Sequence, residues 1–228
     1  MVTLSDLKGS EYLAGLVREN VVEAVKSGKE GSNRVVIYGP PGNGKTFLAK
    51  AIAGELGYEF KDVKAGEIDE GLPDVQGKTL LFLDEFEKFM DVQEIRDSIE
   101  DLSEDVLVVG GTNHPWNIQG LSEAGFNSLV FMPEPGPEAR KAVLREFLGD
   151  GAVSLDLDRL AEMTDGFLPV DIHNTVEAMD EITQESLEER FGGSNPTTLQ
   201  EWMEEAITQR DRLDRTAYKP LLEWLDKQ

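Results

Sequence analysis

Residues 34–46, "RVVIYGPPGNGKT", decide the fold of this chain. The letters at 39–46 fit the pattern Gly-x-x-x-x-Gly-Lys-Ser/Thr, an apolar run precedes them, and helical spacing begins at Thr46. A glycine-rich turn between a buried strand and a helix directs backbone amides and the helix N-terminus at phosphate oxygens. The sequence therefore predicts a phosphate-binding loop rather than a simple Gly/Pro turn.

Each part of this loop has an expected role. Gly42 and Gly44 allow the backbone to approach a phosphate closely, Lys45 reaches the β and γ phosphates, and the Thr46 hydroxyl is a ligand for Mg²⁺. We expect Lys45 to act in catalysis as well as in binding. The predicted nucleotide contacts of this segment are Pro41, Gly42, Asn43, Gly44, Lys45, Thr46 and Phe47.

A second motif is "LLFLDEFEKF" at 80–89. Its apolar residues predict a buried strand that delivers Asp84 and Glu85 at its carboxyl end, where ligands of parallel sheets bind. We expect Asp84 to hold magnesium through water and Glu85 to act as the general base on the attacking water. A solvated helix cap is the alternative, but the phosphate loop upstream favours the functional interpretation.

A third motif follows the apolar run 105–111, which ends at "TN". If this strand lies between the other two, Asn113 is beside the phosphate loop, where its amide would orient the water and sense the γ-phosphate. The alternative is a turn-forming asparagine. We expect His114 and Trp116 to be a loop histidine with its hydrogen bonds satisfied and a packing aromatic.

The wider pattern predicts an α/β part followed by an all-α part. Buried strands are expected at 34–39, 78–84, 105–111 and 127–132, with helices at 46–57 and 91–102. The Pro/Gly cluster "MPEPGP" at 132–137 predicts a hinge and a division into 1–136 and 137–228. Beyond it, helical spacing is found at 138–149, 156–164, 169–190 and 198–209, with a loop at 191–198.

Composition excludes several functions. The chain has no cysteine and only two histidines, His114 and His173, which argues against a zinc or redox enzyme. No apolar run is long enough for a bilayer span and the N-terminus lacks the features of a signal peptide, so we expect a soluble, cytoplasmic protein without membrane contact.

The chain is strongly acidic, with 45 Asp and Glu against 22 Lys and Arg and a formal charge of −23. These carboxylates extend from Asp6 to Asp226, and such a surface repels nucleic acid, so no direct nucleic-acid binding is expected. We favour adaptation to a salt-rich cytoplasm, in a halophilic organism; an acidic face for a basic partner is the alternative.

The three motifs in this order, followed by helices, resemble the AAA-plus ATPases, and specifically their AAA subgroup. "DLKG" at 6–9 is similar to the segment that lies against adenine, which implies contacts from Leu7 and Gly9; "TDGFLPVDIHNTV" at 164–176 resembles the segment that brings Gly166 and Val170 near the nucleotide. The resemblance implies a P-loop NTPase fold, a parallel sheet flanked by helices with a small all-α lid, and ATP and Mg²⁺ as cofactors.

Two departures from that family are visible. Residues 60–79 cross directly between strands, without the aromatic-apolar-Gly pore loop and its following helix, which argues against substrate threading. Residues 112–137 contain no Arg or Lys, and Glu123 and Gly125 fall near the family's arginine positions, although Phe126 keeps its phenylalanine. Arg140 and Arg145 follow, and we expect both to have ordinary surface roles.

The sequence therefore predicts an ATPase that couples binding and hydrolysis of Mg²⁺-ATP to conformational change of a macromolecular partner. The partner is expected to be a protein or a neighbouring subunit, in a homo- or hetero-oligomer. The alternative is a nucleotide-gated interaction module with little hydrolysis of its own. A DNA-loading ATPase is a weaker third hypothesis, because no basic track is present.

Overall fold

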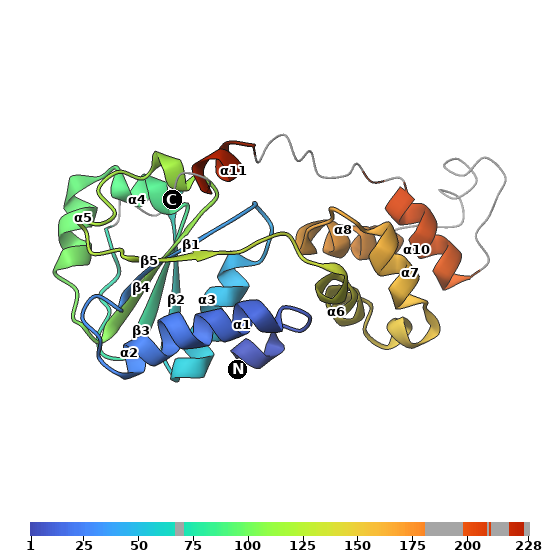
Figure 1. The fold of residues 1–228 in the computed structure, drawn as a ribbon, viewed down its shortest axis with the longest axis horizontal. Helices are drawn as coiled ribbons and strands as arrows, with labels where there is room; N and C mark the ends of the chain where they lie inside the picture. Colours follow the sequence, from blue (N-terminus) through green and yellow to red (C-terminus); the bar gives the residue numbers. More distant parts are fainter. Residues whose placement is uncertain (67–70, 181–197, 209, 211–218, 226–228) are drawn as a thin grey trace. The chain divides into compact units, whose positions relative to one another are not determined.

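The computed structural model describes residues 1–66, 71–180, 198–208, 210 and 219–225, which divide into two compact units (Figure 1). The first unit comprises Met1–Leu7, Glu11–Pro133 and Arg215–Gln228, and the second comprises Lys8–Ser10 and Glu134–Asp214. The main boundary lies close to the division expected at 136/137. The C-terminal segment differs from the predicted division, because it belongs to the first unit.

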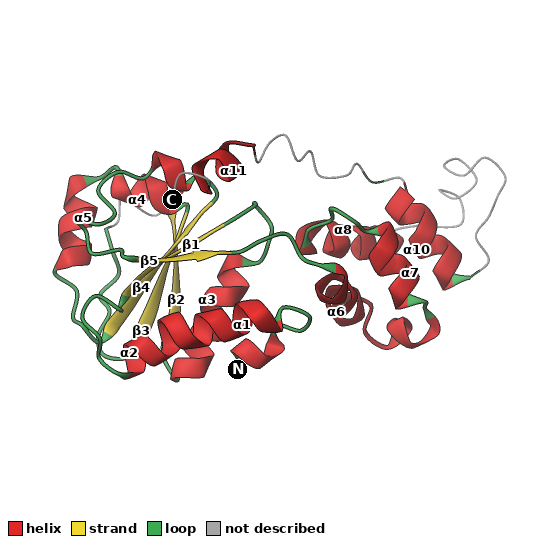
Figure 2. Cartoon of the chain, in the orientation of Figure 1, coloured by secondary structure: helices red, strands yellow, loops and turns green. Residues whose placement is uncertain are grey.

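A five-stranded parallel sheet forms the centre of the first unit (Figure 2). In spatial order its strands are β2 (Glu59–Lys64), β3 (Thr79–Asp84), β4 (Val106–Thr112), β1 (Arg34–Tyr38) and β5 (Ser128–Phe131). The predicted parallel sheet flanked by helices is confirmed. So is the position of β4 between the acidic strand and the strand before the phosphate loop.

Helices cover both faces of this sheet, as successive strand residues point to opposite sides. Val35 and Ile37 pack with α1 (Glu11–Val17), the π-helical turn Arg18–Val22 and α3 (Lys45–Leu56). Val36 points to the other face, toward α4 (Phe86–Met90) and α5 (Gln93–Glu100). The continuous apolar runs of β1, β3 and β4 follow from this two-sided burial. Short helices Leu4–Asp6, α2 (Glu23–Lys26) and Pro115–Asn117 complete this part.

The two edge strands differ from the sequence prediction. β5 was expected to be buried, but it has only one neighbour, β1, and Leu129 is 40% exposed. β2 was not among the expected strands, because four of the six residues in the segment "EFKDVK" are charged. It nevertheless pairs with β3 over its whole length, and Phe60 and Val63 pack on opposite faces.

The C-terminal helix α11 (Lys219–Leu225) packs in the first unit, whereas the predicted division had placed it in the second. Its Trp224 meets the ring of Tyr38 edge-on, with 5.3 Å between ring centroids. An aromatic contact of this kind stabilises the docked helix. Sequence spacing alone does not show which unit such a helix joins.

The second unit consists of helices in its described part. They are α6 (Pro137–Leu148), the 3-10 segment Gly149–Ser154, α7 (Leu157–Met163), α8 (Pro169–Asp180) and α10 (Leu199–Thr208). Their apolar sides meet in a separate core around Leu144, Leu160 and Met203. Each of these four α-helices matches a predicted one, whereas the 3-10 segment was not predicted. The expected end of the third helix at 181–190 and most of the loop at 191–198 lie outside the described residues.

Among the described residues, we find no helix with the length and apolar character required to cross a bilayer.

Candidate functional site

The phosphate-binding loop joins β1 to α3 at the carboxyl edge of the sheet. Gly42 and Gly44 have φ values of 75° and 88°, which residues with a side chain rarely adopt. A Cβ on Gly39 would lie 2.4 Å from the carbonyl oxygen of Met132. The glycines in this motif are thus required by the backbone path and by its close approach to the neighbouring strand.

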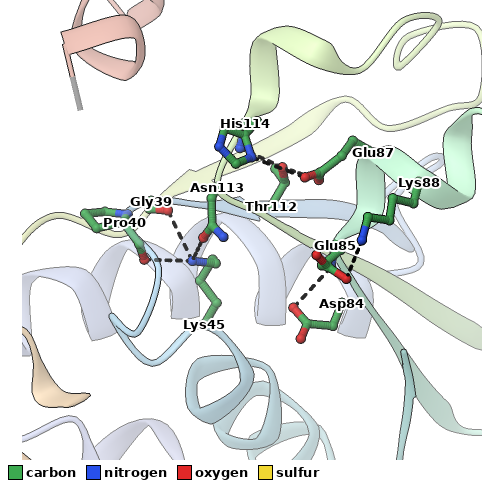
Figure 3. Close-up of polar contacts among 10 residues, drawn as sticks. All are labelled: Gly39, Pro40, Lys45, Asp84, Glu85, Glu87, Lys88, Thr112, Asn113 and His114. Atoms are coloured by element: carbon green, nitrogen blue, oxygen red, sulfur yellow. Dashed lines mark hydrogen bonds and ion pairs between the residues drawn. The ribbon is translucent and has the colours of Figure 1, made fainter. Parts of the chain in front are cut away.

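Lys45 is the first residue of α3, and its side chain is held by oxygen atoms on several sides. Its Nζ donates to the carbonyl oxygens of Gly39 at 3.1 Å and Pro40 at 2.8 Å, and to Oδ1 of Asn113 at 2.5 Å (Figure 3). The residue is only 8% exposed. The structure therefore joins two of the three predicted motifs through one ammonium group.

Burial removes the Lys45 ammonium from water, and nearby negative charge offsets only part of this cost. Desolvation lowers the pKa of Lys45 to about 8, against the opposing effects of Asp84 and Glu87. In the described part of the chain no carboxylate forms an ion pair with it, and all three of its acceptors are neutral. A cation in this state is stabilised by an incoming anion, and the residues present therefore fit a phosphate group.

The rim of the loop is accessible. Pro41 and Gly42 are exposed, Thr46 is half-buried, and the ring of Phe47 is 41% exposed in the first turn of α3. These residues are free to contact a ligand above the loop.

Asn43 is directed elsewhere. Its side chain is buried, and its Nδ2 donates to the carbonyl oxygens of Met132 at 2.8 Å and Pro133 at 2.6 Å. The side-chain amide therefore connects the phosphate loop to the residues that follow β5, where the Glu11–Pro133 segment of the first unit ends. That leaves only its backbone for the predicted nucleotide contact.

Asp84 and Glu85 lie where β3 ends, as predicted. Glu85 is the only non-glycine residue of the described chain with a positive φ, 57°. The next residue, Phe86, is fully buried, and its ring packs against Phe126 with 4.7 Å between ring centroids. The ring fits there because Gly110 has no side chain, since a Cβ on Gly110 would lie 2.4 Å from the Phe86 ring. This packing holds Glu85 in a conformation that costs about 1–3 kcal/mol, of the kind that accumulates at functional sites.

The two carboxylates differ in their surroundings. The backbone N–H of Glu85 donates to Oδ1 of Asp84 at 3.1 Å, while Nζ of Lys88 donates to Oε2 of Glu85 at 2.9 Å (Figure 3). Lys88 and Glu85 are both about half exposed, with side-chain values of 55% and 51%. Glu85 is therefore open to solvent and to a reacting water.

Sequence reasoning missed Glu87. Its Oε2 accepts from Oγ1 of Thr112 at 2.6 Å and its Oε1 lies 3.4 Å from Nδ1 of His114 (Figure 3). The available signal was a third acid in "DEFEKF", two positions beyond Glu85, but only the pairing of β3 with β4 shows what it contacts. His114, expected to be a hydrogen-bonded loop residue, also packs edge-on against Trp116.

The predicted adenine contacts are divided between the units. Leu7 is buried in the core beneath α1 and α3. Gly9, Gly166 and Val170 belong to the second unit, where both glycines have positive φ and Val170 is 40% exposed. Gly9 lies against α6, since a Cβ there would be 2.4 Å from the backbone nitrogen of Ala139. Their role toward a nucleotide stays a prediction.

The expectation of a surface role for Arg140 is wrong. The residue is 4% exposed, and its guanidinium donates to the carbonyl oxygens of Ala161, at 3.1 and 2.8 Å, and Pro135, at 2.8 Å. It therefore joins α6 to the last turn of α7, where backbone carbonyls need donors. Arg145, on the same helix, is exposed as expected.

Comparison with known proteins finds similarity in sequence and in fold. Residues 35–132 match the family model described as "ATPase family associated with various cellular activities (AAA)". A curated relative, Cell division protein C of Sulfolobus acidocaldarius, is 24% identical over 231 residues, covering 85% of this chain. The chain spans 62% of the length of that relative.

Solved structures of similar fold include the FIGL-1 AAA domain in complex with ADP. It has a TM-score of 0.74 at 17% identity and covers 100% of this chain and 91% of its own. A second structure of the FIGL-1 AAA domain has a TM-score of 0.72 at 19% identity, covering 97% and 87%. The match to the AAA family model covers residues 35–132, and the similarity to the FIGL-1 AAA domain shows a shared fold.

Proposed function

We propose that this chain binds and hydrolyses Mg²⁺-ATP and uses the cycle to change the conformation of a protein partner. The observation that carries the proposal is the buried ammonium of Lys45, whose acceptors in the described part of the chain are neutral and which joins the phosphate loop to Asn113. The match to the AAA family over residues 35–132 supports it.

In this proposal each residue has one task. Lys45 and the loop amides bind the phosphates, Asn113 orients the attacking water, and Glu85 accepts its proton. The hydroxyl of Thr46 and the carboxylate of Asp84 would hold magnesium. When bound, that ion neutralises charge that develops on the phosphoryl oxygens. Leu7, Gly9, Gly166 and Val170 would contact the adenosine part.

We also propose that turnover by this chain alone is slow. Nucleotide hydrolases of this kind gain roughly 10³ to 10⁵ in rate from an arginine beside the transferring phosphoryl group. Residues 112–137 contain no Arg or Lys, and Arg140 is buried. A loss of this size corresponds to about 4 to 7 kcal/mol of transition-state stabilisation. For fast turnover the arginine would then come from a partner, whereas the alternative, a nucleotide-gated interaction module, would hydrolyse little ATP by itself.

Steady-state ATP hydrolysis over a wide range of protein concentration, with saturating Mg²⁺, tests the proposal. We expect measurable ATP binding, slow turnover that is abolished by Glu85→Gln, and acceleration by a partner. Fast turnover that rises with self-association and survives Arg145→Ala would show that a different cation completes the site. Absence of ATP binding would overturn the proposal.

We propose that the acidic composition is an adaptation to salt. At a formal charge of −23, screening by molar KCl should relieve carboxylate repulsion and raise the melting temperature. Thermal unfolding in 0.1 and 2 M KCl measures this. A melting temperature that stays constant or falls would favour the alternative, a docking face for a basic partner.

A further inference from the structure

The carboxylate of Glu87 contacts Thr112 and His114, the residues immediately before and after Asn113. We propose that Glu87 is a positioning residue, which fixes residues 112–114 so that the Asn113 amide stays directed at Lys45. The inference rests on the proposed ATPase function and assigns Glu87 no contact with nucleotide.

The hydrogen bonds of Thr112 close this loop (Figure 3). Its hydroxyl has a single hydrogen, and an ionised carboxylate only accepts, so Thr112 must donate to Glu87 at 2.6 Å. A lone pair of the same hydroxyl then accepts from the backbone N–H of His114 at 2.9 Å. The chain before and after Asn113 is thus connected through one oxygen atom, and Glu87 orients that oxygen.

Burial distinguishes Glu87 from its neighbour in sequence. The side chain of Glu87 is 16% exposed, whereas that of Glu85 is 51% exposed. A carboxylate so far removed from water needs donors of its own. Its donors are the Thr112 hydroxyl at 2.6 Å and the His114 ring at 3.4 Å, and the shorter, stronger bond is the one to Thr112.

Among the described residues, Lys45 is the one hydrogen-bond partner of the Asn113 side chain. Its side chain bonds to Nζ of Lys45 at 2.5 Å, an interaction that a phosphate group would compete for. A catalytic amide must remain in position when that competition occurs, because a displacement on the order of 1 Å can lower a rate about 10²-fold. In this proposal Glu87 therefore supplies the rigidity that the Asn113 side chain does not obtain from its own contacts.

Paired variants test this role. Glu87→Ala and Thr112→Val remove the bond, whereas Glu87→Gln and Thr112→Ser each keep an oxygen at the same place. We expect Glu87→Ala and Thr112→Val to lower kcat about tenfold with the Kd for ATP changed less than about twofold, and the two conservative variants to restore most of kcat. Glu100→Ala, an exposed carboxylate on α5, is the control.

Two further measurements separate positioning from general stability. In an Asn113→Ala background, Glu87→Ala should have no additional effect on kcat, because it acts through Asn113. In the nucleotide-free chain, hydrogen exchange of the His114 backbone amide should be about tenfold faster in Glu87→Ala and Thr112→Val, and near wild type in Glu87→Gln and Thr112→Ser.

The outcomes are distinguishable. Additive effects of Glu87→Ala and Asn113→Ala on kcat, or unchanged His114 exchange in Glu87→Ala, would overturn the role of Glu87 while ATP hydrolysis by the wild type still supports the proposed function. If Glu87→Ala does not fold, the Thr112→Val and Thr112→Ser pair decides by the same measurements. A wild-type chain that binds no ATP would overturn both proposals.

Discussion

The phosphate-binding loop and the start of α4 lie at the same edge of the sheet, but their charged residues are held in opposite ways. Lys45 is 8% exposed and bonded to three oxygens of two connecting segments. Glu85 has a half-exposed side chain with one surface ion pair, and its strain is confined to the backbone. The cation is fixed before any ligand arrives, whereas the carboxylate is free to change its partner.

This difference agrees with the separate tasks of the two residues in the proposed reaction. A binding group gains from preorganisation, because ordering it on binding would cost affinity. A general base must release one partner and take a proton from a water molecule. Four experiments would break or sharpen this contrast, beginning with the largest expected effect.

Glu85→Gln should lower the turnover number by roughly 10² to 10⁴, because the amide keeps the shape but cannot accept a proton. ATP affinity should be nearly unchanged, since Glu85 is not part of the phosphate loop. Single-turnover hydrolysis and equilibrium binding measure the two quantities. A Gln variant with wild-type turnover would assign the base to another residue.

Lys45→Ala should weaken ATP binding roughly 10²- to 10³-fold, because two charge-assisted hydrogen bonds to phosphate are lost at about 1.5–3 kcal/mol each, and part of that loss is recovered by water. Titration calorimetry with ATP measures the change, and Glu85→Gln is the control that keeps the loop intact. Equal affinity in wild type and Lys45→Ala would show that the nucleotide binds elsewhere.

The buried ammonium should also give a pH-dependent stability. The pKa of Lys45 is lowered from 10.5 to about 8, so its burial as a cation destabilises the nucleotide-free chain below pH 8. This penalty, about 3 kcal/mol, disappears as the pH rises from about 8 to 10.5. Lys45→Met lacks it at every pH.

Between pH 7.5 and pH 10.5, the free energy of unfolding of the wild type should therefore rise by about 3 kcal/mol relative to that of Lys45→Met. Urea unfolding at several pH values measures it. Phe47→Leu, an uncharged change in the same turn, controls for general effects of alkaline pH. A difference independent of pH would mean that Lys45 is better compensated than its contacts indicate.

Lys88→Ala should have the smallest effect. An exposed ion pair contributes about 0–1 kcal/mol, so releasing Glu85 should raise kcat by up to about fivefold, and less at high salt. Lys88→Arg keeps the cation and is the matched control. A loss of activity greater than tenfold in the Ala variant alone would show that Lys88 takes part in the reaction.

Several features of this protein were determined by the sequence alone. The phosphate loop, the strand before it and the helix after it are contiguous, and the glycines at 42 and 44 are recognisable because their backbone conformation is local. The same holds for Asp84 and Glu85 at the end of an apolar run. The helices of the second unit were predicted from their spacing, which depends on neighbouring turns of one segment.

Other features were decided only by tertiary structure. Glu87 meets Thr112 because β3 pairs with β4, and no spacing within either segment carries that information. Arg140 is buried because the carbonyl groups of Pro135 and Ala161 accept hydrogen bonds from its guanidinium. Its charge and its position in a helix had suggested a surface residue. β2 becomes a strand because β3 offers it a complete edge. Local patterns fix dihedral angles and exposed faces, whereas hydrogen bonds between distant segments depend on which surfaces meet after folding.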